Sequence, residues 1–142
     1  MLMQPTQADR RLTRLREAAG LAGLRVHLQP LPKTAAGDDR VDMAGVYCLP
    51  WQEQRHTRDS WLLAKRKYTH DLHFVGHWEW QGEGRENNED RLKTALETVP
   101  PKVLALARGP QGLCCYWSEI GNEEDVNALA DWLKTNLLTI VA

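Results

Sequence analysis

The sequence predicts an α+β fold, with a largely antiparallel or mixed sheet of about five to six strands and three packed helices. Stretches with strand-like alternation follow one another without an intervening helix, which favours antiparallel or mixed pairing. Three other stretches repeat their apolar residues at helical spacing and begin at capping residues. The chain has 142 residues, 42% of them hydrophobic, which suits a single domain over residues 1–142 with residues 1–5 frayed.

The first helix is expected to begin at Thr6, because Asp9 stands three residues later, as in a capping box. Gly20 and Gly23 are expected to end it. The apolar stripe predicted for this helix consists of Ala8, Leu12, Leu15 and Ala19. Arginines occupy its other faces.

Two hairpins are expected from alternating stretches. Residues 24–31 and 41–49 alternate and are separated by the polar residues 33–40, which predicts a hairpin with a long loop. Residues 102–108 and 113–119 form a second pair around the turn at 109–112. Since residues 103–107 are apolar at every position, this strand is predicted to lie centrally in the sheet.

The stretch 60–82 contains the most pronounced alternation of the chain. Residues 71–80 are predicted to form one strand, whose apolar face carries Leu72, Phe74, Gly76, Trp78 and Trp80. Residues 59–69 fit either a short helix or a strand. We favour a strand that forms a hairpin with 71–80, because Trp61, Leu62 and Leu63 suit strands.

The other two helices are predicted from their first turns. Asn87 or Asn88 precedes Glu89 and Asp90, and Asn122 precedes a run of three acidic residues. Asparagine caps a helix, and acidic residues in the first turn suit the helix dipole. The apolar stripe of the last helix consists of Val126, Leu129, Ala130, Leu133 and Leu137, with Trp132 beside it.

The charge of the chain is divided between its two halves. Residues 1–70 carry a net charge of +5 and residues 71–142 a net charge of −6. Oppositely charged halves can attract each other or face two different partners. The sequence contains no apolar stretch long enough to span a bilayer and no signal-peptide core. We therefore expect a cytoplasmic protein that does not associate with a membrane.

The cysteines are Cys48, Cys114 and Cys115. Their odd number is not typical of a secreted disulfide framework, and no CxxC motif indicates zinc. All three are therefore interpreted as buried thiols.

The histidines offer only weak candidates for a metal site, His73 and His77. Four residues along a strand span about 13 Å, too far for two ligands of one zinc ion. Further ligands such as His27 or His56 would have to complete such a site. Solvated histidines are the default interpretation, and no cofactor is expected. No nucleophile stands in a catalytic motif either, so the sequence favours a protein that is not an enzyme.

Basic residues near aromatic ones are the best lead towards a binding surface. The residues that phosphate contact and base stacking would use are Arg10, Arg14, Arg55, Arg58, Trp61, Lys65, Arg66 and Lys67. The default interpretation is a solvated face that balances the acidic half. Trp51 and Trp61, if exposed, would be anchors for a protein partner.

The sequence thus favours a small cytosolic binding or regulatory protein without catalysis, acting through a protein partner or as a homodimer. The first alternative is a nucleic-acid-binding protein using residues 55–67 and the Arg-rich N-terminal helix. The second is a metal-dependent enzyme using His73 or His77.

Overall fold

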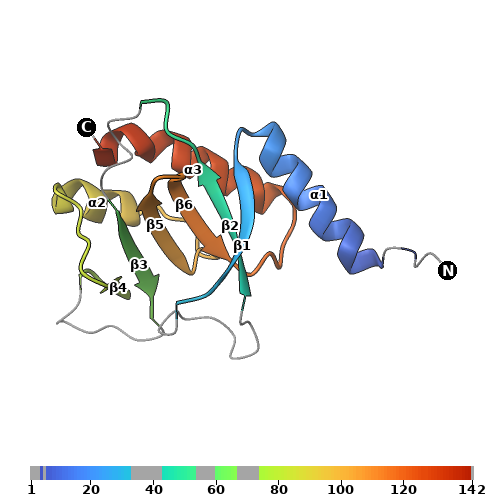
Figure 1. The fold of residues 1–142 in the computed structure, drawn as a ribbon, viewed down its shortest axis with the longest axis horizontal. Coiled ribbons are helices and arrows are strands. Elements are labelled where there is room, and N and C mark those ends of the chain that lie inside the picture. The colour runs from blue at the N-terminus through green and yellow to red at the C-terminus, as the bar shows by residue number, and fades with distance from the viewer. Residues whose placement is uncertain (1–3, 5, 33–42, 54–59, 67–73, 142) are drawn as a thin grey trace.

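The computed structural model describes residues 4, 6–32, 43–53, 60–66 and 74–141. In this part of the chain, three helices and a six-stranded antiparallel sheet confirm the predicted α+β class (Figure 1). The elements are α1 (Gln7–Leu21), β1 (Arg25–Pro30), β2 (Met43–Leu49), β3 (Trp61–Lys65), β4 (Trp78–Gln81), α2 (Glu89–Leu96), β5 (Ala105–Gly109), β6 (Gly112–Trp117) and α3 (Glu123–Val141). The strand order is β1-β2-β6-β5-β3-β4.

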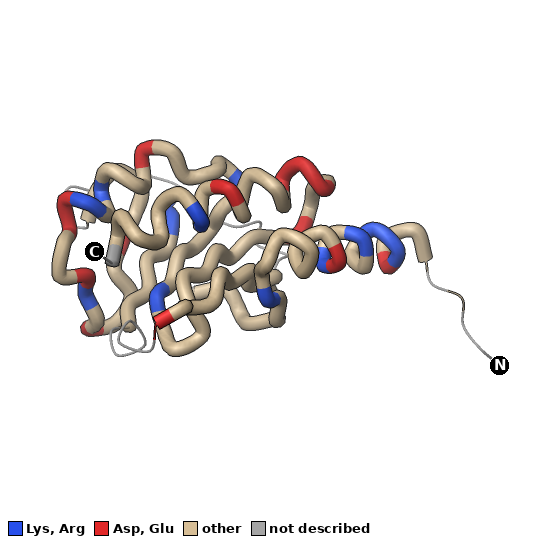
Figure 2. Tube along the Cα trace, turned by 90° about the horizontal axis from the view of Figure 1, so that it is seen from above, with Lys and Arg blue, Asp and Glu red and all other residues tan. Residues whose placement is uncertain are grey.

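The predicted capping box of α1 is present. The Thr6 hydroxyl accepts a hydrogen bond from the Asp9 N–H, and the Asp9 carboxylate accepts one from the Thr6 N–H, both at 3.1 Å. The bond from the Thr6 N–H lowers the pKa of the Asp9 carboxyl. Gly23, with φ +89°, follows the end of the helix. The predicted stripe was wrong at Ala8, which is exposed because the first half of α1 projects from the body of the molecule (Figures 1 and 2).

Residues 61–65 form a strand, not a helix, and β3 pairs antiparallel with β4 as favoured. The prediction of one strand over 71–80 was wrong for residues 74–77, and residues 71–73 lie outside the described part. Gly76 adopts φ +55°, and the Trp78 N–H donates to the Val75 carbonyl at 2.9 Å. The chain therefore turns sharply before Trp78, so only the end of the predicted strand joins the sheet.

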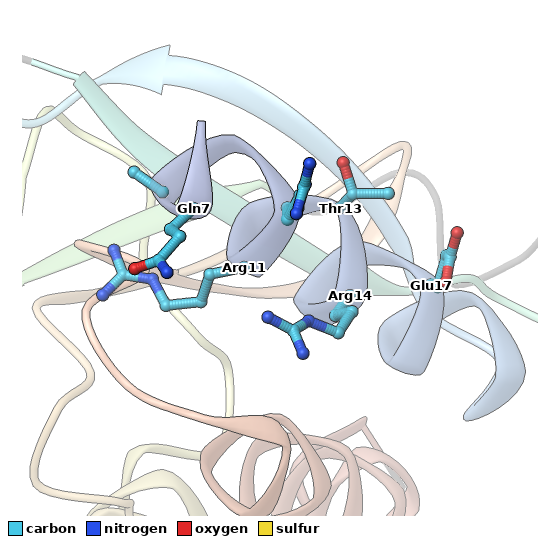
Figure 3. A pocket seen from close by; sticks show the side chains of 7 residues that line it. Gln7, Arg11, Thr13, Arg14 and Glu17 are labelled. Atoms are coloured by element: carbon cyan, nitrogen blue, oxygen red, sulfur yellow. The ribbon is translucent and has the colours of Figure 1, made fainter. Parts of the chain in front are cut away.

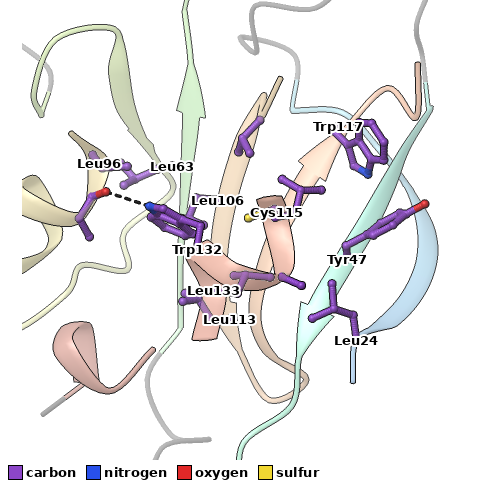
Figure 4. Packing of buried hydrophobic residues seen from close by; sticks show 14 of the residues in the cluster. Leu24, Tyr47, Leu63, Leu96, Leu106, Leu113, Cys115, Trp117, Trp132 and Leu133 are labelled. Carbon is purple, nitrogen blue, oxygen red and sulfur yellow. Dashed lines mark hydrogen bonds between the residues drawn. The ribbon is translucent and has the colours of Figure 1, made fainter. Parts of the chain in front are cut away.

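One face of the sheet packs against the helices and carries the main core. Leu63, Leu106 and Trp117 from the strands are fully buried with Leu92 of α2 and Leu133 of α3. Figure 4 shows side chains of this core between the sheet and the helices. The dashed line is the hydrogen bond from the Trp132 indole to the Ala95 carbonyl on α2. As predicted, β5 is central, between β6 and β3.

The opposite face carries a second cluster of buried residues: Ala44, Val46, Cys48, Ala105, Cys114 and Tyr116. Among the described residues, no helix contributes to this cluster, and we call it the helix-free face. Tyr116 reaches across it from β6, because its hydroxyl donates to the Gln29 side chain on β1 at 2.8 Å. Burial raises the pKa of Tyr116.

The cysteine prediction was wrong for two of the three residues. Cys48 and Cys114 face each other in the β2–β6 register and form a disulfide. Cys115 is a free, buried thiol as predicted, and its side chain packs in the main core on the other face. Cys48 and Cys114 lie 66 residues apart, so only the strand register brings them together.

Within the described residues, no helix is both long and apolar enough to cross a bilayer.

Candidate functional site

The described basic residues do not form one surface. Arg10 and Arg14 are exposed on α1. The Lys65 ammonium, by contrast, donates to the Pro101 carbonyl at 3.1 Å, and burial lowers its pKa. Arg66 lies 2.9 Å from the Glu79 carboxylate. Arg55, Arg58 and Lys67 lie outside the described residues. Two cations of the predicted 55–67 cluster therefore bond within the chain.

A hollow of about 1030 Å³ runs along α1 (Figure 3). All of its lining residues belong to that one helix, between Gln7 and Glu17, so it is an open surface without an opposing wall among the described residues. A second hollow of about 440 Å³ brings Arg11 and Arg14 next to Glu123 and Glu124 at the start of α3. Figure 2 shows both basic and acidic positions at the end of the molecule where the N-terminus lies. Arg11 and Arg14 therefore share this hollow with acidic residues of the same chain.

Two buried carboxylates have structural partners. The first, Glu119, accepts two hydrogen bonds from the Arg16 guanidinium, at 3.0 and 2.9 Å, and one from the Tyr47 hydroxyl at 2.8 Å. The bond to Glu119 raises the pKa of Arg16, and burial raises that of Tyr47. Gly45 leaves room for this carboxylate, since a Cβ there would overlap the Glu119 side chain. The cluster fastens α1 to the sheet.

Glu119 itself adopts φ +62°, which is uncommon for a residue with a side chain. Such a conformation persists when surrounding contacts determine it. Here the hydrogen bonds from Arg16 and Tyr47 supply those contacts. The unusual backbone is therefore explained by the anchoring of α1 and indicates no reaction.

The second buried carboxylate, Glu86, accepts hydrogen bonds from Arg108 on β5 at 2.9 and 2.8 Å. It also accepts one from the Trp61 indole at 2.5 Å. Trp61 is therefore a core residue whose polar end is used inside the protein, and it is not available as a surface anchor.

Trp51 lies differently, because it lines a groove at the surface. The groove, about 310 Å³ in volume, lies between the chain that follows β2 and the last turns of α3. We call it the Trp51 groove; its lining residues are Leu49, Pro50, Trp51, Gln52, Glu53, Lys134, Leu137 and Leu138. Most of its lining residues are apolar, Lys134 and Glu53 contribute opposite charges, and Leu138 is 68% exposed.

The wall formed by Trp51 is held in position from behind. Its indole N–H donates to the Gly109 carbonyl at 2.6 Å, and the Arg108 guanidinium lies 5.3 Å from its ring centroid. Gly112, with φ +127°, permits the close approach of the Leu49 carbonyl, which a Cβ at that position would overlap. The turn between β5 and β6 therefore fixes the groove before any partner arrives.

The described histidines give no support to a metal centre. His77 is exposed in the turn before β4, and His73 lies outside the described residues. Among the residues whose positions are described, no three His, Cys, Asp or Glu side chains gather as metal ligands would. The chain matches no protein-family model, no curated protein and no solved structure.

The sequence indicated the groove only in part. Trp51 was recognised as an anchor if exposed, and Leu137 as part of the α3 stripe. Leu138 and Lys134 were missed, because they reach Leu49 and Pro50 only through the packing of α3 against the sheet. The one signal for Leu138 in the sequence was its position directly after Leu137, where an apolar residue lies outside the predicted stripe of the last helix.

Proposed function

We propose that this protein is a non-catalytic binding protein that takes an apolar side chain of a partner protein into the Trp51 groove. The observation that carries the proposal is an apolar hollow with one fixed aromatic wall, Trp51, and one exposed aliphatic residue, Leu138. Aromatic anchors in preformed hollows are typical of the centres of protein interfaces. A wall that is already fixed loses little entropy when a partner binds.

The size and charge of the groove define its partner. A volume of about 310 Å³ lies at the lower end of the range for drug-sized ligands, which suits a side chain better than a large cofactor. Lys134 and Glu53 supply opposite charges beside the apolar lining residues. The expected ligand is therefore a peptide segment with a Leu, Met or Phe side chain flanked by polar residues.

Leu138→Asp is expected to weaken partner binding about tenfold or more, because burying a leucine side chain contributes about 1.5–3 kcal/mol. The matched control is Asn127→Asp, which adds the same charge at an exposed position of α3 outside the groove. A photo-crosslinking amino acid at position 138 should capture the partner, and one at position 127 should not. Binding constants from calorimetry with the captured partner then compare the two variants.

Equal loss of affinity in both aspartate variants, or equal capture from both positions, would contradict this proposal. The thermal midpoints of the two variants should agree with that of the wild type, since both side chains are exposed.

Nucleic-acid binding through α1 is a second candidate, favoured by the exposed Arg10 and Arg14 on that helix. Arg10→Gln/Arg14→Gln should reduce the slope of log affinity against log salt by about 1.8, because each phosphate contact contributes about 0.9. Arg85→Gln/Arg91→Gln removes the same charge from exposed sites elsewhere and should leave the slope unchanged. Fluorescence anisotropy of labelled DNA and RNA, titrated at several salt concentrations, measures this slope. No binding at low salt would eliminate this candidate.

A further inference from the structure

A continuous row of side chains crosses four strands of the helix-free face. The strand registers place Arg25 opposite Cys48, Cys48 opposite Cys114, and Cys114 opposite Ala107. Side chains directly opposite each other on antiparallel strands are close neighbours, with Cβ atoms about 4.5–5.5 Å apart. The Cys48–Cys114 disulfide therefore has Arg25 as the neighbour of Cys48 and Ala107 as the neighbour of Cys114.

The two sulfurs differ in their access to solvent. Cys114 lines a hollow of about 310 Å³ on the helix-free face, together with Ala107 and the turn between β5 and β6. Cys48 does not line this hollow. Cys114 is 5% exposed and Cys48 1% exposed. A small molecule that enters the hollow therefore meets the Cys114 sulfur first.

The direction of approach also favours Cys114. A thiolate displaces one sulfur of a disulfide by approaching in line with the bond that breaks. For attack on Cys114, this line comes from the side away from Cys48, where Ala107 presents only a methyl group and borders the hollow. For attack on Cys48, the line comes from the side of Arg25, whose side chain is much longer than the methyl group of Ala107.

The leaving group is the third reason. The sulfur that leaves does so as a thiolate, and a thiol with a lower pKa leaves faster. A neighbouring arginine stabilises a thiolate. Arg25 stands opposite Cys48 and not opposite Cys114, so Cys48 is the better leaving group. Solvent access, the direction of approach and the neighbouring charge all favour attack on the Cys114 sulfur.

We propose that Cys114 is a site of reversible modification by small thiols. A thiolate forms a bond to the Cys114 sulfur, the bond to Cys48 breaks, and the electron pair stays on Cys48, which takes a proton from solvent. A second thiolate then attacks the sulfur of the added group and releases Cys114 as a thiolate, which is protonated in turn. Two small thiols are oxidised to one disulfide, and the protein disulfide is reduced to two thiols.

Cys115 takes no part in this exchange. Its side chain packs in the main core on the opposite face, and burial raises the pKa of its thiol. Iodoacetamide should therefore label Cys114 in the folded protein once both cysteines are reduced, and Cys115 only after unfolding.

The test uses the full chain and reduced glutathione as the probe. Samples quenched with acid within seconds, then alkylated and mapped by mass spectrometry, should carry glutathione on Cys114 about tenfold more often than on Cys48. Adducts mainly on Cys48 would overturn the proposal. So would an intact disulfide after prolonged exposure of the folded protein.

Variants that spare both cysteines test the reasons separately. Ala107→Leu should slow reduction about tenfold or more by filling the line of approach, while Gln111→Leu, in the same hollow, should not. Arg25→Gln should slow it about threefold if the pKa of the leaving thiol rises by about one unit. Arg10→Gln removes the same charge from α1 and is the control; it should leave the rate of reduction unchanged. Wild-type rates in both Ala107→Leu and Arg25→Gln would overturn the assignment of the attacked sulfur.

Discussion

Arg108→Met is expected to lower the free energy of unfolding by about 3–5 kcal/mol, because it leaves the Glu86 carboxylate buried without its cation. Both side chains of this ion pair are 4% exposed. One guanidinium nitrogen donates to both carboxylate oxygens, at 2.9 and 2.8 Å. The same variant also removes the cation that lies over the Trp51 ring. Urea denaturation followed by tryptophan fluorescence measures the loss.

The exposed ion pair between Lys102 and Asp125 is the matched control. Its atoms lie 2.8 Å apart, but its side chains are 48% and 28% exposed. The pair with Lys102 and the capping bond to Asn122 lower the pKa of Asp125. Solvent screens such a pair, so Lys102→Met should cost less than about 1 kcal/mol. Equal costs for the two Met variants would contradict the assignment of Glu86 and Arg108 as a buried pair.

A second change should rescue the first. Glu86→Gln removes the negative charge and keeps an oxygen that can accept the Trp61 indole bond. The double variant Glu86→Gln/Arg108→Met should therefore recover most of the loss, because no unpaired charge remains buried. A double variant that is less stable than Arg108→Met alone would show that packing, not charge, dominates at this site.

The helices were predictable because their signals are local. Thr6 and Asp9 stand within one turn of each other, as do Asn122 and Asp125, and the structure shows the side-chain bonds that this spacing predicts. Alternation likewise predicted that β1 pairs with β2 and β5 with β6. It failed over residues 74–77, where Gly76 permits a turn that the pattern of its neighbours did not indicate.

The site residues were less predictable because their partners are distant in the sequence. Glu86 meets Arg108 and Glu119 meets Arg16 only after the sheet and α1 have assembled. The Trp51 groove needs the last turns of α3 beside the chain that follows β2. Composition indicated that tryptophans were available as anchors, and tertiary packing decided that Trp61 is buried and Trp51 lines a groove.

Removal of the disulfide is expected to lower the free energy of unfolding by about 4 kcal/mol. Cys48 and Cys114 are separated by 66 residues, and cross-linking a loop of that length removes much of the entropy of the unfolded chain. β2 and β6 are paired along five positions, so we expect the folded state to need little rearrangement without the disulfide. The variant is Cys48→Ala/Cys114→Ala, measured by urea denaturation.

The reduced wild type is the control that separates the bond from the side chains. With a reductant present, its urea midpoint should approach that of the double variant, and the reductant should not shift the double variant itself. The slope m should also rise when the bond is absent, because an uncrosslinked unfolded chain exposes more surface. A loss below about 1 kcal/mol with an unchanged slope would show that the disulfide does not restrict the unfolded chain. The registers of β2 and β6 would then hold Cys48 and Cys114 together without help from the bond.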